Sequence, residues 1–415
     1  MRLTDLEEAM LAGEHGEPRR FAMEQLVQVG EFFDAEDCVE ISHVHLMADT
    51  EALGESGVAF LEQLAAHPFK ERRVRVPTLT DPRGADFKAY KRIRQSEAIV
   101  ALERRAIEAL RALGIMMTDT CIIYQTIQPP TFGEHVAYGD TGSTIYANSV
   151  LGARSNFEGG PAALSAALTG RVPRYGFHLE ERRRGSTLFR LEDRPRCLSD
   201  WGAVGGIVGR SMTSYWEVPV IAGVSAPVRS DELKHFGAAL ASFGSTPLFH
   251  MVGITPEARD LATAFDGTPP QAHPIGRADI DAFYASYGIK GEGLDVVVFA
   301  APQMSLFEME QLAGLLDGKR VHGKTTVLIA TSPEVKAASD RMGLTETIET
   351  SGAIVLEGVC FYQMHAREIG EANGWRTLMT NSAKLVNIIG GYGYQPTLRP
   401  MERCIACAVA GKVLP

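Results

Sequence analysis

The stretch LDVVVFAAP, residues 294–302, decides the fold class of this chain. It is an almost unbroken apolar run, which is typical of a strand buried on both faces of a sheet. SLFEMEQLAGLLDG (305–318) then has the periodicity of a helix, and TTVLIATS (325–332) is a second apolar run. A strand, a helix and a strand in this order predict a parallel sheet with helices on its faces.

The alternation continues towards the carboxyl terminus. SPEVKAASDRMG (332–343) is typical of a helix, GAIVLEGVC (352–360) of a strand, and WRTLMTNSAKLVNIIGG (375–391) of a strand that leads into a helix. Residues 291–415 are therefore predicted to form an α/β lobe. In such a lobe, ligands bind in loops at the carboxyl ends of the strands.

Two further lobes are expected upstream. Residues 1–65 are predicted to be mainly helical, with one strand, VEISHVHL, at 39–46. Residues 66–290 are expected to combine short strands with a long helix from Lys88 to Leu113 and a second helix at 230–243, with Ser230 as its N-cap. Three segments of this region have the composition of strands: YGFHL (175–179), VPVIAGV (218–224) and STPLFHMVGI (245–254).

Composition and charge exclude several classes of protein. The chain has 415 residues, of which 45% are hydrophobic and 22% charged, and its net charge is −10. No apolar run approaches the roughly 20 residues of a membrane span, and the acidic amino-terminal segment does not resemble a secretory signal. A cytoplasmic protein is expected. Its basic clusters are short and lie beside acidic residues, so neither nucleic acid nor a membrane is an expected partner.

Residues 141–164, TGSTIYANSVLGARSNFEGGPAAL, are unusually rich in hydrogen-bonding side chains. We expect a polar loop that ends in a short helical run, PAALSAAL (161–168). Because buried polar groups need partners, the apolar neighbours Val150 and Leu151 point to a binding site in which a ligand supplies those partners. The polar residues concerned are Asn148, Ser149, Arg154, Ser155, Asn156 and Glu158.

One apparent motif is misleading. GKRVHGKT (318–325) matches the phosphate-binding pattern G-x-x-x-x-G-K-[ST]. That loop needs a strand before it and a helix after it, because the phosphate binds at the helix amino terminus. Here a helix precedes the motif and a β-like run follows it, so nucleotide binding is not predicted. GAVGGIVG (202–209) lacks the dinucleotide-binding spacing and is expected to be a closely packed helix or turn.

The chain has six cysteines, and a cytosolic protein of this size does not need disulfides. Cys404 and Cys407 form a C-x-x-C pair without the second pair of a zinc ribbon, so by themselves they are expected to be core residues of a terminal helix. Cys121 and Cys360 each end a short apolar segment. Cysteines that converge from separate strand ends suit an iron–sulfur cluster, but spacing leaves open whether these converge.

Two other groups of polar residues allow more than one interpretation. His43 and His45 alternate on an expected strand and share a face, where core or ligand-supporting positions are favoured over metal ligation. Asn381, Ser382 and Lys384 lie where a strand leads into a helix. Ser382 suits an N-cap, and anion binding at the helix amino terminus is the alternative.

Several of these segments together resemble aconitase X, an outlying branch of the aconitase superfamily. The most specific are TDTCIIYQ (118–125) and the run from FGEHVAYGDTGS to RVPRYGFHL (132–179). Supporting segments occur along most of the chain: LTDLEEAMLAGEHGE (3–17), VPTLTDPRG (76–84), HMVGITPEA (250–258), AAPQMSLFEM (300–309), TNSAKL (380–385) and ERCIACAVAG (402–411).

The resemblance implies an aconitase-like, multi-lobed α/β architecture with parallel or mixed sheets flanked by helices. It also implies a dehydratase, that is a hydro-lyase, which binds an iron–sulfur cluster. In the one-chain form of the family, a small swivelling domain is fused to the catalytic part. Residues 1–415 have no room for that domain, so the chain is expected to be the large, catalytic subunit of the two-chain form, with a separate small subunit as its partner.

The resemblance further implies Cys121, Cys360 and Cys404 as cluster ligands. Archaeal members have a cysteine in a G-C-P-H motif where this chain has Ala301, so a [2Fe–2S] and a [4Fe–4S] cluster both stay open. The alanine, together with GVC at 358–360 in place of D-T-C, favours the bacterial activity on cis-3-hydroxy-L-proline over the archaeal activity on mevalonate 5-phosphate.

The substrate implied is thus a small hydroxy amino acid, and the product is Δ1-pyrroline-2-carboxylate. Arg154 suits a bidentate contact with the substrate carboxylate. A serine of the small subunit is expected to contribute to removal of the α-proton, with His135 and Lys384 as candidates within this chain. The other expected substrate contacts are Asn148, Ser149, Ser155, Asn156 and Ser382.

Three other readings of the sequence remain open. The first is a hydro-lyase that acts on mevalonate 5-phosphate or another hydroxy acid. The second is an iron–sulfur protein for electron transfer or sensing, whose cluster needs no open iron position. The third is a non-catalytic scaffold subunit in which all the cysteines are inert.

Overall fold

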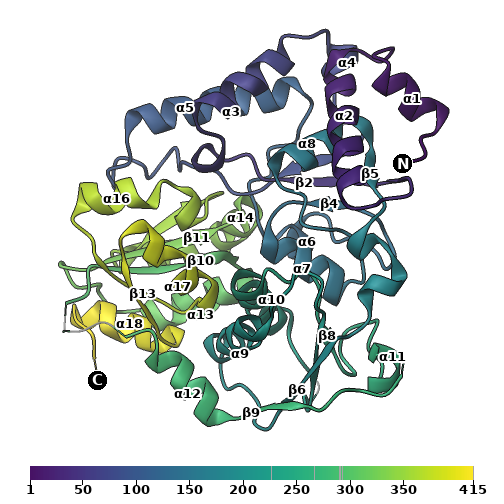
Figure 1. Cartoon of the computed structure of the whole chain (residues 1–415). Helices are drawn as coiled ribbons and strands as arrows, with labels where there is room; N and C mark the ends of the chain where they lie inside the picture. Colours follow the sequence, from purple (N-terminus) through teal and green to yellow (C-terminus); the bar gives the residue numbers. More distant parts are fainter. Residues whose placement is uncertain (226, 266, 289–290, 292, 415) are drawn as a thin grey trace.

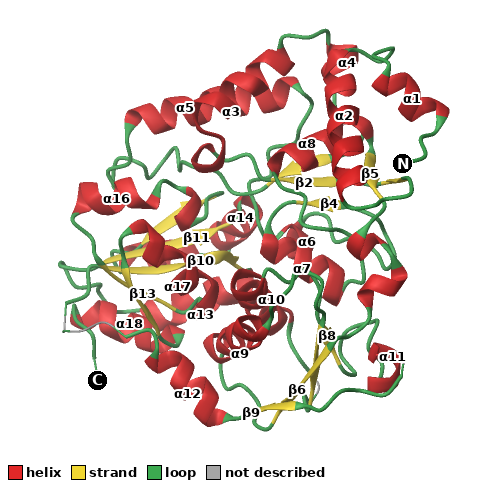
Figure 2. Cartoon of the chain, viewed as in Figure 1, coloured by secondary structure: helices red, strands yellow, loops and turns green. Residues whose placement is uncertain are grey.

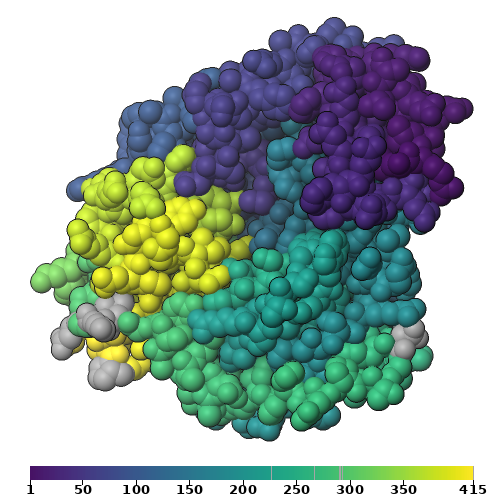
Figure 3. All heavy atoms as spheres, in the orientation of Figure 1, coloured from purple at the N-terminus to yellow at the C-terminus, as the bar shows by residue number. Residues whose placement is uncertain are grey.

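The computed structural model describes the chain except for residues 226, 266, 289–290, 292 and 415. Within this part, the strands form four sheets, and helices pack around them (Figures 1 and 2). Segments from the two ends of the sequence lie side by side on one face of the molecule (Figure 3). None of the described helices is long and apolar enough to cross a membrane.

The largest sheet confirms the predicted alternation of strands and helices. Its strand order is β12-β11-β10-β13-β14, and every pairing is parallel. The central strand, β10, is buried along its whole length. The strands are β10 (Val296–Met304), β11 (Thr326–Thr331), β12 (Ile354–Glu357), β13 (Thr377–Thr380) and β14 (Gln395–Leu398). The helices of this region are α13 (Leu306–Leu316), α14 (Pro333–Arg341), α15 (Leu344–Thr350), α16 (Ala366–Asn373), α17 (Ala383–Ile389) and α18 (Met401–Ala410).

Three smaller sheets belong to the rest of the chain. Two are parallel, with the orders β3-β2-β4 and β8-β7-β6-β9, and the third is the antiparallel pair β1-β5. Their strands are β1 (Cys38–Glu40), β2 (Val44–Leu46), β3 (Thr78–Thr80), β4 (Ala137–Tyr138), β5 (Arg171–Pro173), β6 (Thr187–Leu191), β7 (Pro219–Ala222), β8 (His250–Met251) and β9 (His273–Ile275).

Twelve of the described α-helices precede β10. They are α1 (Asp5–Leu11), α2 (Glu17–Phe32), α3 (Thr50–Ala65), α4 (Phe69–Arg72), α5 (Glu97–Ala112), α6 (Ile123–Thr126), α7 (Thr141–Val150), α8 (Gly160–Thr169), α9 (Leu198–Ser211), α10 (Ser230–Gly244), α11 (Leu261–Phe265) and α12 (Arg277–Ala285). The described 3₁₀ helices are η1 (Gly176–His178), η2 (Glu180–Arg183), η3 (Phe361–Gln363) and η4 (Gly390–Tyr392).

The polar stretch at 141–164 is mainly helical, where a loop was expected. α7 begins where the Asp140 carboxylate accepts a hydrogen bond from the backbone N–H of Ser143 at 2.8 Å. α8 has Pro161 in its first turn, where a backbone N–H is not needed. Most residues of α7 are buried, so the helix lacks the polar outer face that produces a recognisable periodicity.

The expected helix from Lys88 is also shorter in the structure. Arg94 has a left-handed φ of 55°, which a continuous α-helix cannot contain. α5 therefore begins at Glu97. Ser96 is its N-cap, and its side chain accepts a hydrogen bond from the backbone N–H of Ala98.

Three local expectations need correction as well. The expected strand at 39–46 divides into β1 and β2, which pair with different sheets. YGFHL at 175–179 contains the 3₁₀ helix η1 and no strand. Ser230 is the first residue of α10, and Arg229 occupies the N-cap position, where the Glu232 carboxylate accepts from its backbone N–H.

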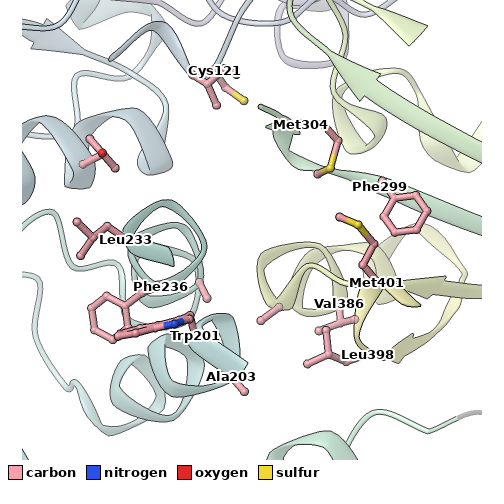
Figure 4. Packing of buried hydrophobic residues seen from close by; sticks show 14 of the residues in the cluster. Cys121, Trp201, Ala203, Leu233, Phe236, Phe299, Met304, Val386, Leu398 and Met401 are labelled. Carbon is pink, nitrogen blue, oxygen red and sulfur yellow. The ribbon is translucent and has the colours of Figure 1, made fainter. Parts of the chain in front are cut away.

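The core lies where α9 and α10 pack together beside the large sheet. Trp201 of α9 and Phe236 of α10 form one wall, and Phe299 and Met304 of β10 lie opposite (Figure 4). A Cβ atom added to Gly205 would lie 2.2 Å from the Phe236 carbonyl oxygen, so glycine permits the close approach of the two helices. GAVGGIVG is thus confirmed as a closely packed helix. GKRVHGKT lies between α13 and β11, in the reverse of the phosphate-loop order.

A buried charged cluster joins α10 to α13. The Glu308 carboxylate accepts hydrogen bonds from Lys234 and His235, and all three side chains are at most 1% exposed. Burial raises the pKa of Glu308, but Lys234 and His235 lower it far more, so this pKa lies well below its usual range. Glu308 also closes a capping box with Ser305 at the start of α13. The ionised Glu308 carboxylate thus fixes the start of α13 and the contact between α13 and α10.

Glu308→Ala is expected to lower the free energy of unfolding by about 3 kcal/mol, because it leaves the buried ammonium of Lys234 without its main partner. Urea denaturation at neutral pH measures the change. Glu310 is exposed on the same helix, so Glu310→Ala is the control, with an expected change below about 0.5 kcal/mol. Equal effects of the two substitutions would contradict the structural role of the cluster.

The stabilisation by Glu308 also has a pH dependence of known sign. A carboxyl group whose folded-state pKa is depressed stabilises the protein above its unfolded-state pKa of about 4.3, and this stability is lost as the pH falls below that value. The difference in unfolding free energy between the wild type and Glu308→Gln should therefore be largest near neutral pH and shrink below about pH 4. Urea denaturation across this pH range tests this prediction. A constant difference would show that the ionised form of Glu308 does not stabilise the protein.

Candidate active site

The candidate active site lies at the carboxyl end of the large sheet, where distant segments meet. Cys121 precedes α6 and lies beside the end of β10 (Figure 4), Cys360 follows β12, and Lys384 is in the first turn of α17. The Cys360 thiol is the largest cause of the raised pKa of Cys121, followed by burial. Burial lowers the pKa of Lys384, but Asp140, Cys121 and Cys360 raise it above its usual value. The structure thus brings together three of the predicted site residues.

Gln303, near the end of β10, connects the segments that carry the two cysteines. Its side-chain oxygen accepts from the backbone N–H of Cys121 at 3.2 Å, and its amide group donates to the Val359 carbonyl at 3.1 Å. Its backbone N–H points to the Cys121 sulfur at 3.4 Å. Sequence reasoning missed this residue, although a glutamine at the end of an apolar strand is a signal that a buried polar group has a specific task.

Lys384 and Asp140 form a buried ion pair. The Lys384 ammonium lies 3.0 Å from Asp140 Oδ1, and both side chains are at most 5% exposed. The other oxygen of Asp140 accepts from the backbone of Ser143, which orients the carboxylate. Burial raises the pKa of Asp140, but Lys384 and the Ser143 N–H lower it below its usual value. The cation of this site is therefore already partnered within the chain.

Asp81 is a second buried carboxylate, and only one of its oxygens has a hydrogen-bond donor in the described structure. Gln363 donates to Asp81 Oδ2 at 2.7 Å, whereas Asp81 Oδ1 is buried without a partner. Burial is the largest cause of its raised pKa, and Asp140 and Cys121 add to it. His45 lies 3.6 Å from Oδ1, but burial lowers its pKa to about 4, so the ring is neutral.

Asp81 and Asp140 were not among the predicted site residues. Asp81 directly follows β3, and Asp140 comes two residues after β4, at the carboxyl ends of two strands of the same parallel sheet. That position is where sites form in parallel sheets, so it is the signal that could have identified them. The short length of these strands hid it in the sequence.

Asn381 has an unusual environment at the end of β13. The residue is fully buried, and neither its amide nitrogen nor its amide oxygen has a hydrogen-bond partner among the described residues. Its neighbour Ser382 is the N-cap of α17, which confirms that interpretation, and its hydroxyl donates to the Ala301 carbonyl. Buried amide groups are normally bonded, so Asn381 is a candidate for contact with a bound molecule.

Most polar side chains of the stretch already have partners in the described structure, and the exception among the residues named for it is Glu158, whose Oε1 is buried without one. Asn148 donates to the carbonyls of Ser155 and Pro247, and its oxygen accepts from the Ser155 N–H. Ser149 accepts from the Phe249 N–H at 2.8 Å. Ser155 and Asn156 likewise bond to the backbone, at Asn156, Tyr138, Tyr175 and Phe177. Neighbouring backbone thus already pairs these four side chains in the described structure, and their role as substrate contacts stays a prediction.

Arg154 and His135 lie together in another environment. The Arg154 guanidinium contacts the Glu180 carboxylate and donates to the His178 carbonyl at 3.2 Å. The Nδ1 atoms of His135 and His178 are 2.9 Å apart. Burial lowers the pKa of His135, and Arg154 lowers it further. The described contacts thus place these two predicted residues with His178, while Lys384 lies with the cysteine pair.

Cys404 and Glu158 are also buried, each in a separate setting. The Cys404 thiol on α18 donates to the Arg399 carbonyl at 3.4 Å, and Cys407, one turn along, is also buried, which confirms the expected terminal helix. Glu158 is fully buried, and burial raises its pKa to about 7. Among the described residues, the one group of three side chains whose ligand atoms converge within 4.8 Å consists of Glu51, His365 and Glu368, and it contains no cysteine.

A surface pocket of about 430 Å³ adjoins the cysteine segment. Its lining includes Ile122, which follows Cys121, and Ser305, which follows β10. Asp231 lies in the same wall, where its carboxylate accepts from the Ser305 hydroxyl at 2.7 Å. The pocket is large enough for a small organic acid.

Comparisons with known proteins agree with this architecture. Three family models match consecutive parts of the chain: aconitase X first domain at residues 1–181, second domain at 185–285 and third domain at 294–410. The crystal structure of Thermococcus kodakaraensis aconitase X in its holo-form has a TM-score of 0.86 and 30% sequence identity, over 98% of this chain and 99% of that one.

Two curated relatives have different names. The phosphomevalonate dehydratase large subunit of Methanosarcina mazei is 34% identical, over 99% of this chain and 98% of that protein. The cis-3-hydroxy-L-proline dehydratase of Pseudomonas aeruginosa is 33% identical, over 99% of this chain and 70% of that protein. Both are dehydratases, and both are matched along nearly the whole of this chain. The chain therefore belongs to the aconitase X family, and it is an enzyme of the hydro-lyase class.

Proposed function

We propose that the chain is the large subunit of an iron–sulfur-dependent dehydratase that converts cis-3-hydroxy-L-proline to Δ1-pyrroline-2-carboxylate. The observation that carries this choice of substrate is the charge of the site. Lys384 is already paired with Asp140, and Asp81 forms no ion pair with a charged cation in the described structure. A phosphorylated substrate brings more negative charge than one already paired ammonium can balance, whereas a small zwitterion brings its own cation.

Arg83, two positions after Asp81 in the sequence, does not supply a free positive charge to the site either. The Arg83 guanidinium binds the Asp119 carboxylate through two nitrogens, at 2.7 and 2.5 Å. It also lies 3.8 Å from the buried Glu103 carboxylate. Arg83 is therefore already partnered, and a phosphate would have to compete with two carboxylates for it.

The cysteine pair fits part of the ligand set of an iron–sulfur cluster. Cys121 and Cys360 are buried side by side, and an N–H group directed at a cysteine sulfur, as Gln303 provides, is one of the features that tune such clusters. We propose these two as ligands. When bound, a cluster with an open iron position supplies a Lewis acid for a substrate hydroxyl. The thiol of Cys404, the third cysteine implied by the family resemblance, donates to the Arg399 carbonyl just before its own helix.

The reaction breaks the C3–O bond and the Cα–H bond of the substrate. The hydroxyl group leaves as water after it gains a proton, and the resulting enamine tautomerises to the Δ1-pyrroline. Lys384, which its ion pair with Asp140 keeps charged, is proposed to hold the substrate carboxylate and to stabilise the charge that develops at Cα. The base for the α-proton is proposed to come from a small subunit, with His135 as the weaker candidate in this chain.

A second candidate function is the dehydration of mevalonate 5-phosphate. The observation in its favour is length: this chain covers 98% of the Methanosarcina mazei large subunit and 70% of the Pseudomonas aeruginosa hydroxyproline enzyme. The same length match supports the proposal that this chain works with a separate small subunit, as the name of the archaeal relative implies for that protein.

The first test is turnover by the complex of this chain with its small subunit under anaerobic conditions. We expect cis-3-hydroxy-L-proline to yield Δ1-pyrroline-2-carboxylate, detected by its adduct with o-aminobenzaldehyde. Mevalonate 5-phosphate should be left unchanged, because Lys384 is already paired with Asp140 and does not balance the charge of a phosphate as well. The large subunit alone is the matched control and should be inactive. Turnover of mevalonate 5-phosphate instead would replace the proposed substrate by the second candidate.

Cysteine variants test the ligand set. Cys121→Ala and Cys360→Ala should each lose most of their iron and sulfide and at least about a hundredfold in kcat, because each removes a proposed thiolate ligand. Cys404→Ala should retain iron, since its thiol bonds to Arg399, and half-buried Cys197→Ala is the neutral control. Iron and acid-labile sulfide assays give the readout. Loss of iron in Cys404→Ala would instead require α18 to approach the cysteine pair in the loaded enzyme.

A further inference from the structure

Asp81 is a buried carboxylate that forms no ion pair with a charged cation among the described residues. Its side chain is fully buried, and Oδ1 has no hydrogen-bond partner in the described structure. Oδ2 accepts from the amide of Gln363, which is a neutral donor. An ionised carboxylate in such surroundings is costly unless a cation joins it.

His45 does not supply the cation that an ionised Asp81 would need. Its Nε2 atom lies 2.8 Å from the Thr120 carbonyl, a group that can only accept, so Nε2 carries the proton and donates it there. Its Nδ1 atom is buried without a partner and holds a lone pair in the neutral ring. The 3.6 Å separation between His45 and Asp81 is therefore a contact with a neutral ring, and the Asp81 charge is left uncompensated.

The lysine of the site is committed elsewhere. Lys384 lies 3.0 Å from Asp140 Oδ1, while the other Asp140 oxygen is engaged at the start of α7. The described site thus holds two buried carboxylates and one ammonium. A water molecule could bond to Asp81 Oδ1 without balancing the charge of the ionised carboxylate, whereas a cationic donor would do both.

We propose that Asp81 binds the ring ammonium of the substrate and thereby selects α-amino acids over other hydroxy acids. This inference rests on the proposed function, because cis-3-hydroxy-L-proline carries a secondary ammonium next to the carbon that loses its proton. Mevalonate 5-phosphate has no cationic group and would add negative charge beside Asp81. A substrate without a cationic group would leave the buried Asp81 carboxylate unpaired. The free-energy cost of that unpaired group disfavours binding of the wrong substrate.

Asn381 fits the same substrate class. Its amide nitrogen and oxygen are both buried without partners, so it can donate to one substrate group and accept from another. The amino acid core offers such a pair, because its carboxylate accepts and its ammonium or hydroxyl donates. Lys384 lies three residues further along, in the first turn of the helix that Ser382 caps, which brings a carboxylate partner to the same strand end.

Binding of two unreactive ligands tests the role of Asp81 separately from catalysis. L-Proline and cyclopentanecarboxylate share their ring size and carboxylate and differ in the ammonium group, and neither has a hydroxyl to lose. We expect the wild-type complex to bind L-proline about ten- to a hundredfold more tightly than the carbocycle, measured by anaerobic calorimetry. In Asp81→Asn this preference should fall to about twofold or less, because the neutral amide cannot form an ion pair with the ammonium.

Glu103→Gln is the matched control, because Glu103 is an equally buried carboxylate that instead accepts from Thr50 and Gly84. It should keep the wild-type preference. Asp81→Ser replaces Asp81→Asn if circular dichroism shows the latter to be unfolded. A wild type without preference for L-proline, or an Asp81 variant that keeps it, overturns the inference. A preference for L-proline without hydroxyproline turnover would refute the proposed reaction and leave the role of Asp81 standing.

Discussion

The side chain of Gln303 is the constraint on which the arrangement of the site depends. From the end of the central strand, it bonds to Cys121 on one side and to Val359, next to Cys360, on the other. Its amide group also lies within hydrogen-bond distance of the Asp119 and Thr331 carbonyls. Cys121 and Gln303 are 182 residues apart in the chain. A buried amide with several fixed partners admits one geometry, so a single side chain sets the position of both thiols.

The same strand end is connected to the charged cluster between α10 and α13. The Lys234 ammonium donates to the Gln303 carbonyl at 3.2 Å as well as pairing with Glu308. The buried charges of the molecule are therefore of two kinds. Lys234 and Glu308 are mutually satisfied and stabilise the scaffold, whereas Asp81 lacks a counter-ion. A protein tolerates a buried charge without a counter-ion where a bound ligand supplies the opposite charge. The positions of unpaired groups therefore help to distinguish a binding site from structural polar clusters.

The polar stretch after residue 140 illustrates how easily the two kinds are confused. Asn148, Ser149, Ser155 and Asn156 are all buried, yet each bonds to backbone groups within the chain, so their density reflects the packing of α7 with the loop that follows it. Glu158 of the same stretch has an unpartnered oxygen in the described structure, whereas Asp81 and Asn381, which also have unpartnered atoms, lie outside the stretch. Local richness in polar residues therefore predicted a buried, highly specified segment without showing which groups face a ligand.

The sequence by itself determined the α/β alternation after residue 291, because apolar runs and helical periodicity are local properties of β10, α13 and β11. It also placed Cys121, Cys360 and Lys384 near the ends of predicted strands, but left open whether they converge, and only the family resemblance implied the two cysteines as ligands. Tertiary structure decided the rest. Whether Cys404 joins the other cysteines, whether Arg154 is free, and whether Asp81 has a counter-ion all depend on contacts between segments far apart in the chain, such as Gln363 with Asp81. Such pairings leave no periodic trace in the sequence, because they are fixed by the folding of the whole chain rather than by neighbouring residues.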